Sequence, residues 1–260
     1  MKSNILNRFL AVVILAITVS CGQQTQSKLS GTDSRLGAEV SESASNLFVV
    51  LSGNGSCDKG GGTVIAPGLR ENELFWAFDQ WVMPSGLVKP SDNVLYACYD
   101  WQSPVMRLYD LRYRQQMIPI NETELDGFVY AHARTARKIV IIGHSHAGWR
   151  AMKLASSPLL TSFLQVPILL ATIDAVSRVT CQRLREPGCR EAPTDFSQME
   201  WSILNTRTVW TNLYHQPAII LGSGPMAAAH FNQNFNANHV QMQTDPYVWQ
   251  SVRNFIQAYL

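Results

Sequence analysis

No run of lysine or arginine residues occurs in this chain of 260 residues. Charged residues make up only 15% of the sequence, and the formal net charge is +2 at pH 7. A protein that binds nucleic acid needs a basic patch or stripe that neutralises phosphates. The charge pattern therefore gives no reason to expect a nucleic-acid partner.

Sequence motifs that bind metals or phosphates are also missing. The cysteines form no Cys-x-x-Cys pair, the spacing typical of zinc sites. Glycines gather at Gly53, Gly55 and residues 60–62, but their spacing matches neither G-x-G-x-x-G nor a Walker sequence. A metal site at His144 and His146 would need further ligands, and neighbouring positions on a tight turn point apart. We therefore expect no cofactor.

An apolar run over residues 9–19 is too short to cross a bilayer. Lys2 and Arg8 precede it and small residues follow it, which is the order of a secretory signal peptide. Residues 18–21, Thr-Val-Ser-Cys, resemble the lipobox of bacterial lipoproteins, in which the cysteine becomes the lipid-modified first residue of the mature chain. The resemblance implies that Cys21 carries the lipid.

These features predict three segments. Residues 1–20 form a lipoprotein signal peptide, residues 21–45 the lipidated cysteine and a flexible polar tether, and residues 46–260 one folded domain. The lipid would hold the protein on a membrane of the bacterial envelope, at its periplasmic or surface face, with each buried methylene contributing ~0.8 kcal/mol. The alternatives are an ordinary signal peptide cut near Cys21 and a buried core helix.

Four cysteines remain when Cys21 is set aside, in a compartment that should be oxidising. Four cysteines allow three pairings. We favour one disulfide between Cys57 and Cys98 and another between Cys181 and Cys189, because the last two are close in sequence. Buried free thiols are the alternative.

Segments typical of strands and helices alternate from residue 46 onward. Short apolar runs predict buried strands over residues 46–52, 94–99, 138–142, 167–173 and 206–214. Apolar residues at helical spacing predict helices over residues 72–83 and 122–136, and a closing helix that starts near residue 245. This alternation predicts a mostly parallel sheet with helices on both faces.

A serine lies at the corner where one strand turns directly into a helix. The strand of residues 138–142 leads into Gly-His-Ser-His-Ala-Gly, residues 143–148, and a helical pattern follows. This arrangement resembles the nucleophile elbow, G-x-S-x-G, of the α/β-hydrolase family, with Ala147 in place of the second glycine. The resemblance implies the α/β-hydrolase fold and an exposed nucleophile, Ser145, on a strained turn beside backbone N–H donors.

The family's chain order is serine, acid, histidine. His239 lies in a polar loop just before the closing helix, where the family places its base, so we expect it to activate the serine. His215 and His230 are the other candidates. A surface or core histidine with no catalytic role is the alternative for all three.

The acid is expected at Asp174, the carboxylate at the end of the apolar strand 167–173. The family usually places its acid one strand later, but no Asp or Glu occurs in residues 201–243. A carboxylate at a strand end needs a partner to offset its desolvation, and an imidazole would supply one. The alternative is an aspartate that caps a helix.

The oxyanion would be bound by two backbone N–H groups. One is that of His146, which follows the serine. The other is that of Asn54, because "FVVLSGNGSC" resembles the family's HGNGS-type loop. Each donor would stabilise the transition state by on the order of 3 kcal/mol.

These expectations describe a serine hydrolase that cleaves a carboxylic ester of a small molecule or lipid, as an esterase or lipase. Residues 175–205 are long enough to form a lid, which a Cys181–Cys189 disulfide would stiffen, so we expect a small cap or none. A binding lipoprotein without catalysis, or an acyltransferase or amidase with the same triad, is the alternative.

Overall fold

The computed structural model describes residues 45–53, 57, 73–99, 106–110, 118–176, 196–204, 206–215 and 224–260. All of them lie in one compact unit, Ser41–Leu260. The expected signal peptide, Cys21, Asn54, Cys181 and Cys189 lie outside the described residues, as does most of the expected lid. No helix within these ranges is long and apolar enough to cross a membrane.

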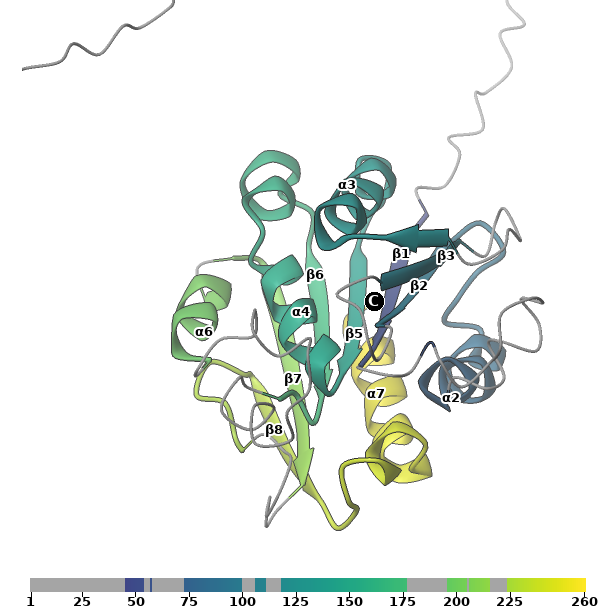
Figure 1. Ribbon diagram of the computed structural model, residues 1–260, viewed down its shortest axis with the longest axis vertical. Helices are drawn as coiled ribbons and strands as arrows, with labels where there is room; N and C mark the ends of the chain where they lie inside the picture. Colours follow the sequence, from purple (N-terminus) through teal and green to yellow (C-terminus); the bar gives the residue numbers. More distant parts are fainter. Residues whose placement is uncertain are drawn as a thin grey trace, which may run out of the picture. The chain divides into compact units, whose positions relative to one another are not determined.

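An eight-stranded sheet forms the centre of this unit, in the order β4-β3-β2-β1-β5-β6-β7-β8 (Figure 1). Neighbouring strands from β2 through β1 to β8 are parallel, whereas β3 pairs antiparallel with β2 and with β4. The strands are β1 Leu47–Ser52, β2 Asn93–Tyr99, β3 Met106–Asp110, β4 Ile118–Ile120, β5 Ile139–His144, β6 Ile168–Ile173, β7 Thr208–His215 and β8 Phe231–Phe235.

Helices cover both faces of the sheet (Figure 1). They are α2 Glu73–Trp81, α3 Glu122–Ala133, α4 His146–Ala155, α6 Ser197–Leu204 and α7 Pro246–Tyr259. Side chains alternate between the faces of a strand, so Leu47, Val49 and Leu51 pack in one core with α3, α4 and α6. Phe48 and Val50 pack in the other core with α2 and α7. Burial on both faces explains why β1, β5 and β6 each carry a run of at least four consecutive apolar residues.

Two helices begin at clear side-chain caps. Asn121 accepts a hydrogen bond from the backbone N–H of Glu124 at 2.9 Å, and the Glu124 side chain accepts one from the Asn121 N–H at 2.7 Å, which is a capping box. Asp245 accepts from two backbone N–H groups in the first turn of α7, at 2.8 and 3.1 Å. Pro246 occupies the first position of α7, as the sequence predicts.

Strands β3, β4 and β8 are not predicted by the apolar pattern. β8 reads Phe-Asn-Gln-Asn-Phe, and its first four residues are exposed at the edge of the sheet. Such a strand has no apolar run, so its sequence resembles a loop. The predicted helix over residues 122–136 ends earlier, at Ala133, and the predicted strand over 206–214 spans Thr208–His215.

The predicted Cys57–Cys98 disulfide is present, with an S–S distance of 2.01 Å. It joins the end of β2 to the segment that follows β1. The backbone N–H of Cys57 also donates to the carbonyl of Tyr99 at 3.3 Å. These contacts tie Cys57 to the carboxyl end of the sheet. A mostly parallel eight-stranded sheet covered on both faces by helices is the predicted α/β-hydrolase fold.

Candidate active site

Ser145 joins β5 to α4 in a strained backbone conformation, with φ 59° and ψ −131°. A residue other than glycine in such a conformation costs on the order of 1–3 kcal/mol, so the surrounding structure must hold it in place. The Ser145 N–H donates to the carbonyl of Ile173 at 3.1 Å. The Ser145 carbonyl accepts from the N–H groups of Gly148 at 2.9 Å and Val176 at 3.1 Å. The corner is therefore braced against the chain that leaves β6.

Small residues allow this corner to pack closely. A Cβ atom on Gly53 would lie 2.7 Å from the Cβ and 3.1 Å from the Oγ of Ser145. A Cβ atom on Gly148 would lie 2.5 Å from the Cβ of Ala175. Ala147, at the position of the second glycine in the G-x-S-x-G pattern, is fully buried. The residue that packs closely against the chain after β6 is Gly148.

The structure brings the expected nucleophile, base and acid together. His239, in the loop between β8 and α7, places Nε2 2.8 Å from Ser145 Oγ. Its other ring nitrogen, Nδ1, lies 2.6 Å from Asp174 Oδ2. Asp174 follows β6 directly, is fully buried, and has φ 47°, a second strained position at this end of the sheet.

This geometry defines the direction in which a proton could move. With a hydrogen on Nδ1, the His239 ring donates to Asp174 and leaves Nε2 as an acceptor for the Ser145 hydroxyl. The carboxylate then favours an imidazolium if His239 takes the serine proton. The arrangement can therefore activate a hydroxyl for attack on an electrophile.

His144 supports the loop that carries His239. Its Nε2–H donates to the carbonyl of His239 at 3.0 Å, and the two rings stack with centroids 4.8 Å apart. Burial, reinforced by the nearby His239 ring, lowers the pKa of His144 to about 3. Its ring is therefore neutral at pH 7. The sequence does not predict this contact between His144 and His239, because the fold is needed to bring residue 239 beside residue 144.

The side chain of His146 is buried next to the corner. Its ring packs edge-on against Tyr99 and Trp149, with centroids 4.8 and 5.4 Å away. The indole N–H of Trp149 donates to His146 Nδ1 at 3.1 Å. Burial lowers the pKa of His146 to about 4, so this ring is also neutral at pH 7. The His144 and His146 rings thus contact different neighbours.

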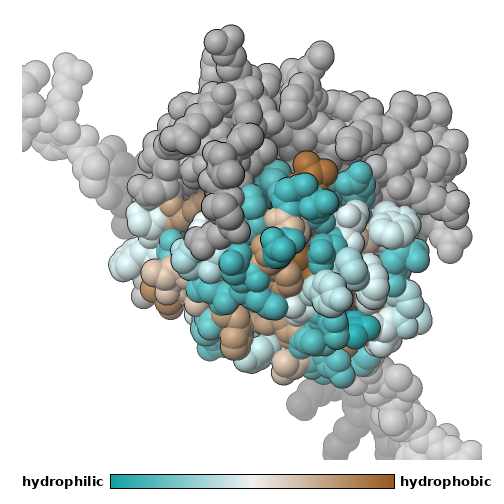
Figure 2. Space-filling model, turned by 90° about the horizontal axis from the view of Figure 1, so that it is seen from below, coloured by the Kyte–Doolittle hydropathy of each residue, from teal (hydrophilic) through white to brown (hydrophobic). Residues whose placement is uncertain are grey.

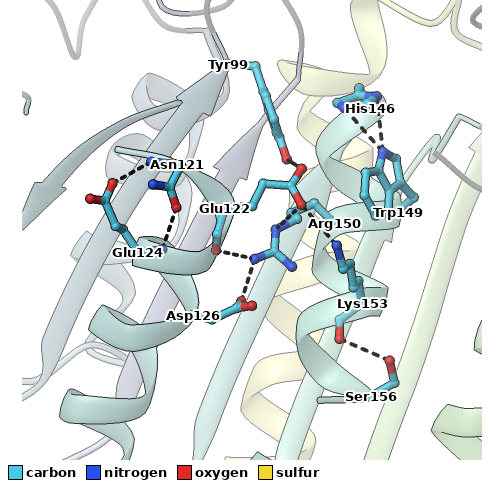
Figure 3. A network of polar contacts seen from close by, with 10 residues as sticks. All are labelled: Tyr99, Asn121, Glu122, Glu124, Asp126, His146, Trp149, Arg150, Lys153 and Ser156. Atoms are coloured by element: carbon cyan, nitrogen blue, oxygen red, sulfur yellow. Dashed lines mark hydrogen bonds and ion pairs between the residues drawn. The ribbon is translucent and has the colours of Figure 1, made fainter. Parts of the chain in front are cut away.

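A polar network holds α4 against α3 beneath this corner (Figure 3). Arg150 is fully buried on α4 and donates to Asp126 Oδ1 at 2.5 Å and to the carbonyl of Glu122 at 2.8 Å. The Glu122 carboxylate accepts from the Tyr99 hydroxyl at 3.0 Å and from Lys153 Nζ at 3.1 Å. Burial opposes ionisation of Glu122, but the charges of Arg150 and Lys153 outweigh it and lower its pKa. Because Tyr99 also packs against His146, the network connects to the proposed oxyanion donor.

The two other candidate bases have different surroundings. His215, the last residue of β7, is buried and places Nδ1 2.6 Å from Asp174 Oδ2. His230 is exposed, and its Nδ1 accepts from the backbone N–H of Trp210 at 3.2 Å. Among the described residues, these two rings therefore bond to Asp174 and to the backbone of Trp210, and His239 is the histidine that bonds to Ser145 Oγ. The parallel register of β6 and β7 brings their carboxyl ends together, and with them Asp174 and His215.

Asp174, His215 and His239 form the one group in the described part of the chain that could offer three metal ligands within 4.8 Å of one another. Each imidazole Nδ1 lies 2.6 Å from Asp174 Oδ2, a hydrogen-bond distance. Tetrahedral zinc with bonds of about 2.0–2.2 Å would separate its ligand atoms by about 3.3 Å. The geometry therefore fits hydrogen bonding to the carboxylate better than a zinc site.

One face of the molecule, seen from below, carries mostly hydrophilic side chains with separate small hydrophobic areas (Figure 2). Val240, next to His239, is 55% exposed, and Tyr247 at the start of α7 is 71% exposed. Among the described residues in this view, no broad apolar surface is visible.

No family model matches this chain, and no curated protein matches it. Among solved structures, the chain is similar to a protein from Lactobacillus plantarum WCFS1 that is provisionally assigned as a cell surface hydrolase. The two are 12% identical with a TM-score of 0.39, over 83% of this chain and 91% of that chain. At this distance the likeness carries no weight for function, and the fold assignment depends on the sheet described above.

Proposed function

We propose that this protein is a serine hydrolase that cleaves carboxylic esters through an acyl-enzyme. The observation that carries the proposal is the chain of contacts from Ser145 Oγ to His239 Nε2 at 2.8 Å and from His239 Nδ1 to Asp174 Oδ2 at 2.6 Å. Ser145 also lies at the amino end of α4, where backbone N–H groups favour negative charge. Together these features supply a nucleophile, a base and an electrostatic site for an oxyanion.

In the proposed acylation, Ser145 Oγ attacks the ester carbonyl carbon while His239 Nε2 takes the hydroxyl proton. The carbonyl oxygen becomes an oxyanion, which accepts hydrogen bonds from the backbone N–H groups of His146 and Asn54. When the carbon–oxygen bond to the leaving alcohol breaks, His239 Nε2 returns the proton to that alcohol. The product of this half-reaction is an ester of Ser145.

Water completes the cycle by the same route in reverse. His239 Nε2 takes a proton from water, and the resulting hydroxide oxygen attacks the acyl carbon. The bond to Ser145 Oγ breaks and Oγ regains the proton from His239. Both half-reactions therefore need His239 to alternate between base and acid while Asp174 stays ionised.

The neutral state of His144 favours this proton transfer. A positive charge on His144, whose ring stacks 4.8 Å from that of His239, would repel the imidazolium that forms in each half-reaction. Because burial lowers the pKa of His144 to about 3, that repulsion is absent at neutral pH. His144 can then hold the backbone of His239 at no electrostatic cost to the base.

The finer assignments belong to the same proposal. The histidine before the serine resembles lipase and esterase elbows, which favours an ester of a small molecule or lipid over a peptide. A lipid on Cys21 would keep the enzyme on a membrane of the bacterial envelope, and nucleic acid is not proposed as a partner. Residues outside the described ranges, including Asn54 and the expected lid, would complete the substrate site.

The test is the intact mass of the purified protein after exposure to a fluorophosphonate, which reacts with activated serines. Wild type should gain one adduct, and Ser145→Ala and His239→Ala should not. Ser156→Ala is a matched control, because it removes an exposed hydroxyl from the other end of α4 that bonds only within its own helix turn, to Lys153 O at 3.0 Å. Circular dichroism would show that all variants are folded.

If wild type labels, fresh unlabelled enzyme would next be assayed on esters of increasing acyl length, with an added alcohol or amine as a competing acceptor. Release of free acid would support hydrolysis, and release of the acceptor's ester or amide would indicate an acyltransferase. No adduct on folded wild type would contradict the proposal and favour a binding lipoprotein on the same fold.

A further inference from the structure

Two histidines bind the same oxygen of one carboxylate. His215 Nδ1 and His239 Nδ1 each lie 2.6 Å from Asp174 Oδ2. The backbone N–H of His215 also donates to the other oxygen, Oδ1, at 3.4 Å. His215 therefore contacts both oxygens of the carboxylate that orients the proposed base.

All three side chains are nearly removed from solvent. The side chain of Asp174 is fully buried, and those of His215 and His239 are 11% and 12% exposed. A carboxylate at such a site needs hydrogen-bond donors to offset the loss of hydration. His215 supplies two of them from the end of β7, the strand that pairs with β6, which positions Asp174.

Contact with both oxygens restricts rotation of the carboxylate. The backbone N–H of residue 215 reaches Oδ1 whatever its side chain, whereas the imidazole of His215 ties Oδ2 to the end of β7, so Oδ2 cannot turn away without losing that bond. The orientation of Oδ2 matters because the Asp174–His239 bond decides where His239 Nε2 points. Rotation of the carboxylate would therefore displace the base from Ser145 Oγ.

We propose that His215 is a positioning residue that fixes Asp174, so that Asp174 in turn directs His239 toward Ser145. This inference rests on the proposed hydrolase function. His215 acts through the carboxylate, because its ring nitrogen Nδ1 and its backbone N–H both bond to Asp174. The end of β7 thus contributes a histidine to the site, while the acid comes from the end of β6.

Two substitutions separate the hydrogen bond from the volume of the side chain. His215→Leu keeps a side chain of similar size, but the new side chain is apolar and has no donor for Oδ2. His215→Asn keeps an N–H donor at nearly the place of Nδ1, because the amide nitrogen is the same number of bonds from Cβ. His230→Leu is the control. This exposed histidine lies just before β8, and its ring bonds to the backbone of Trp210 and not to Asp174.

The experiment measures kcat and KM on a soluble ester, and the rate of fluorophosphonate labelling, for wild type and the three variants. A misplacement of about 1 Å in a catalytic group lowers the rate by about 10²-fold. His215→Leu should therefore lower kcat and the labelling rate by up to about 10²-fold, with little change in KM. His215→Asn should restore most of both rates, and His230→Leu should match wild type.

Proton NMR gives a readout that a role in stability alone would not change. The Nδ1 proton of His239 in its short bond to Asp174 should give a strongly downfield resonance, identified by its loss in His239→Ala. In His215→Leu this resonance should move upfield, and in His215→Asn it should return. Ser145→Ala should leave it present, so the hydrogen bond can be followed without activity.

The outcomes distinguish the inference from the function on which it rests. A wild type that neither labels nor cleaves esters contradicts the proposed function, while the NMR comparison still tests the positioning of the carboxylate. An active wild type whose folded His215→Leu variant keeps its rates and its downfield resonance overturns the role of His215. Equal loss of rate and resonance in the Leu and Asn variants also overturns it, because the donor would then not be what matters. If His215→Leu does not fold, His215→Phe takes its place as the variant without a donor to Oδ2, and the same outcomes support or overturn the inference.

Discussion

Gly53→Ala should disable the site while leaving most of the fold intact. The added Cβ would lie 2.7 Å from the Cβ of Ser145, 3.1 Å from its Oγ and 3.1 Å from the carbonyl of His144. None of these atoms is the end of a long flexible side chain, so the backbone of one segment must move. The disulfide that ties Cys57 to Cys98 limits how far the segment after β1 can yield.

Relief of this contact requires a shift of about 1 Å, because unstrained carbon atoms pack at about 3.5–4.0 Å. Overpacking of this kind costs about 1–3 kcal/mol of stability. The same shift would separate Ser145 Oγ from His239 Nε2, and misplacement by about 1 Å lowers a catalysed rate by about 10²-fold. We therefore expect fluorophosphonate labelling to slow by about that factor, with only a moderate loss of stability.

The assay compares labelling rates by intact mass and stability by urea unfolding. Gly127→Ala is the matched control, because a Cβ atom at this position in α3 meets nothing within 4 Å. Alanine is a better helix former than glycine by about 1 kcal/mol, so the control should label normally and be slightly more stable. A folded Gly53→Ala protein that labels as fast as wild type would refute the reasoning.

Two further predictions concern stability. Replacing Cys57 and Cys98 together by alanine should lower the free energy of unfolding by up to about 4 kcal/mol, the loop-closure value for cross-linked residues 41 apart, as measured by urea unfolding. An unchanged unfolding midpoint would contradict this. The second prediction concerns His144 and His146, whose pKa values are lowered to about 3 and about 4 from 6.5. Because the unfolded chain binds protons there first, stability should be complete above about pH 6.5 and fall at lower pH, by about 2 kcal/mol for each histidine between pH 7 and pH 5. Urea unfolding of wild type and His146→Phe at both pH values would check this, and the variant should show a smaller loss, whereas parallel losses would contradict the assignment.

The choice between a small soluble ester and a lipid bears on the proposed membrane anchor. In the described part of one face, hydrophobic areas are small and separated by hydrophilic side chains (Figure 2). A lipid anchor at Cys21 would place the enzyme at a membrane without requiring a broad apolar surface on the folded domain. An ester panel that spans soluble and micellar substrates therefore addresses chain length and physical state together.

Local patterns were sufficient to predict several parts of the fold and the candidate site. The strand before Ser145, the corner of small residues and the helix after it are consecutive in the chain, so the sequence pattern predicted this corner, and its resemblance to the family's motif suggested the elbow. Asp174 could be predicted because it ends an apolar strand, and His239 because it precedes an amphipathic helix with a clear cap. Their catalytic roles remain predictions, although the structure places them within hydrogen-bond distance of one another and of Ser145.

Other parts depend on contacts between distant segments. β8 is an exposed edge strand, so neighbouring β7 and not an apolar pattern makes it a strand. His144 and His215 become support for the site only when the sheet brings residue 144 beside residue 239 and residue 215 beside residue 174. No local spacing encodes such pairs, because each partner is tens of residues away.

The sequence by itself determined the alternation of the buried strands with the main helices, the serine at the corner after β5 and the types of residue available for chemistry. These follow from periodicity, turn geometry and side-chain chemistry, which act over a few residues. Only the tertiary structure decided which histidine faces Ser145 and that Asp174 binds two imidazoles instead of one. Those choices depend on strand register and helix packing, which bring the ends of β5, β6 and β7 together.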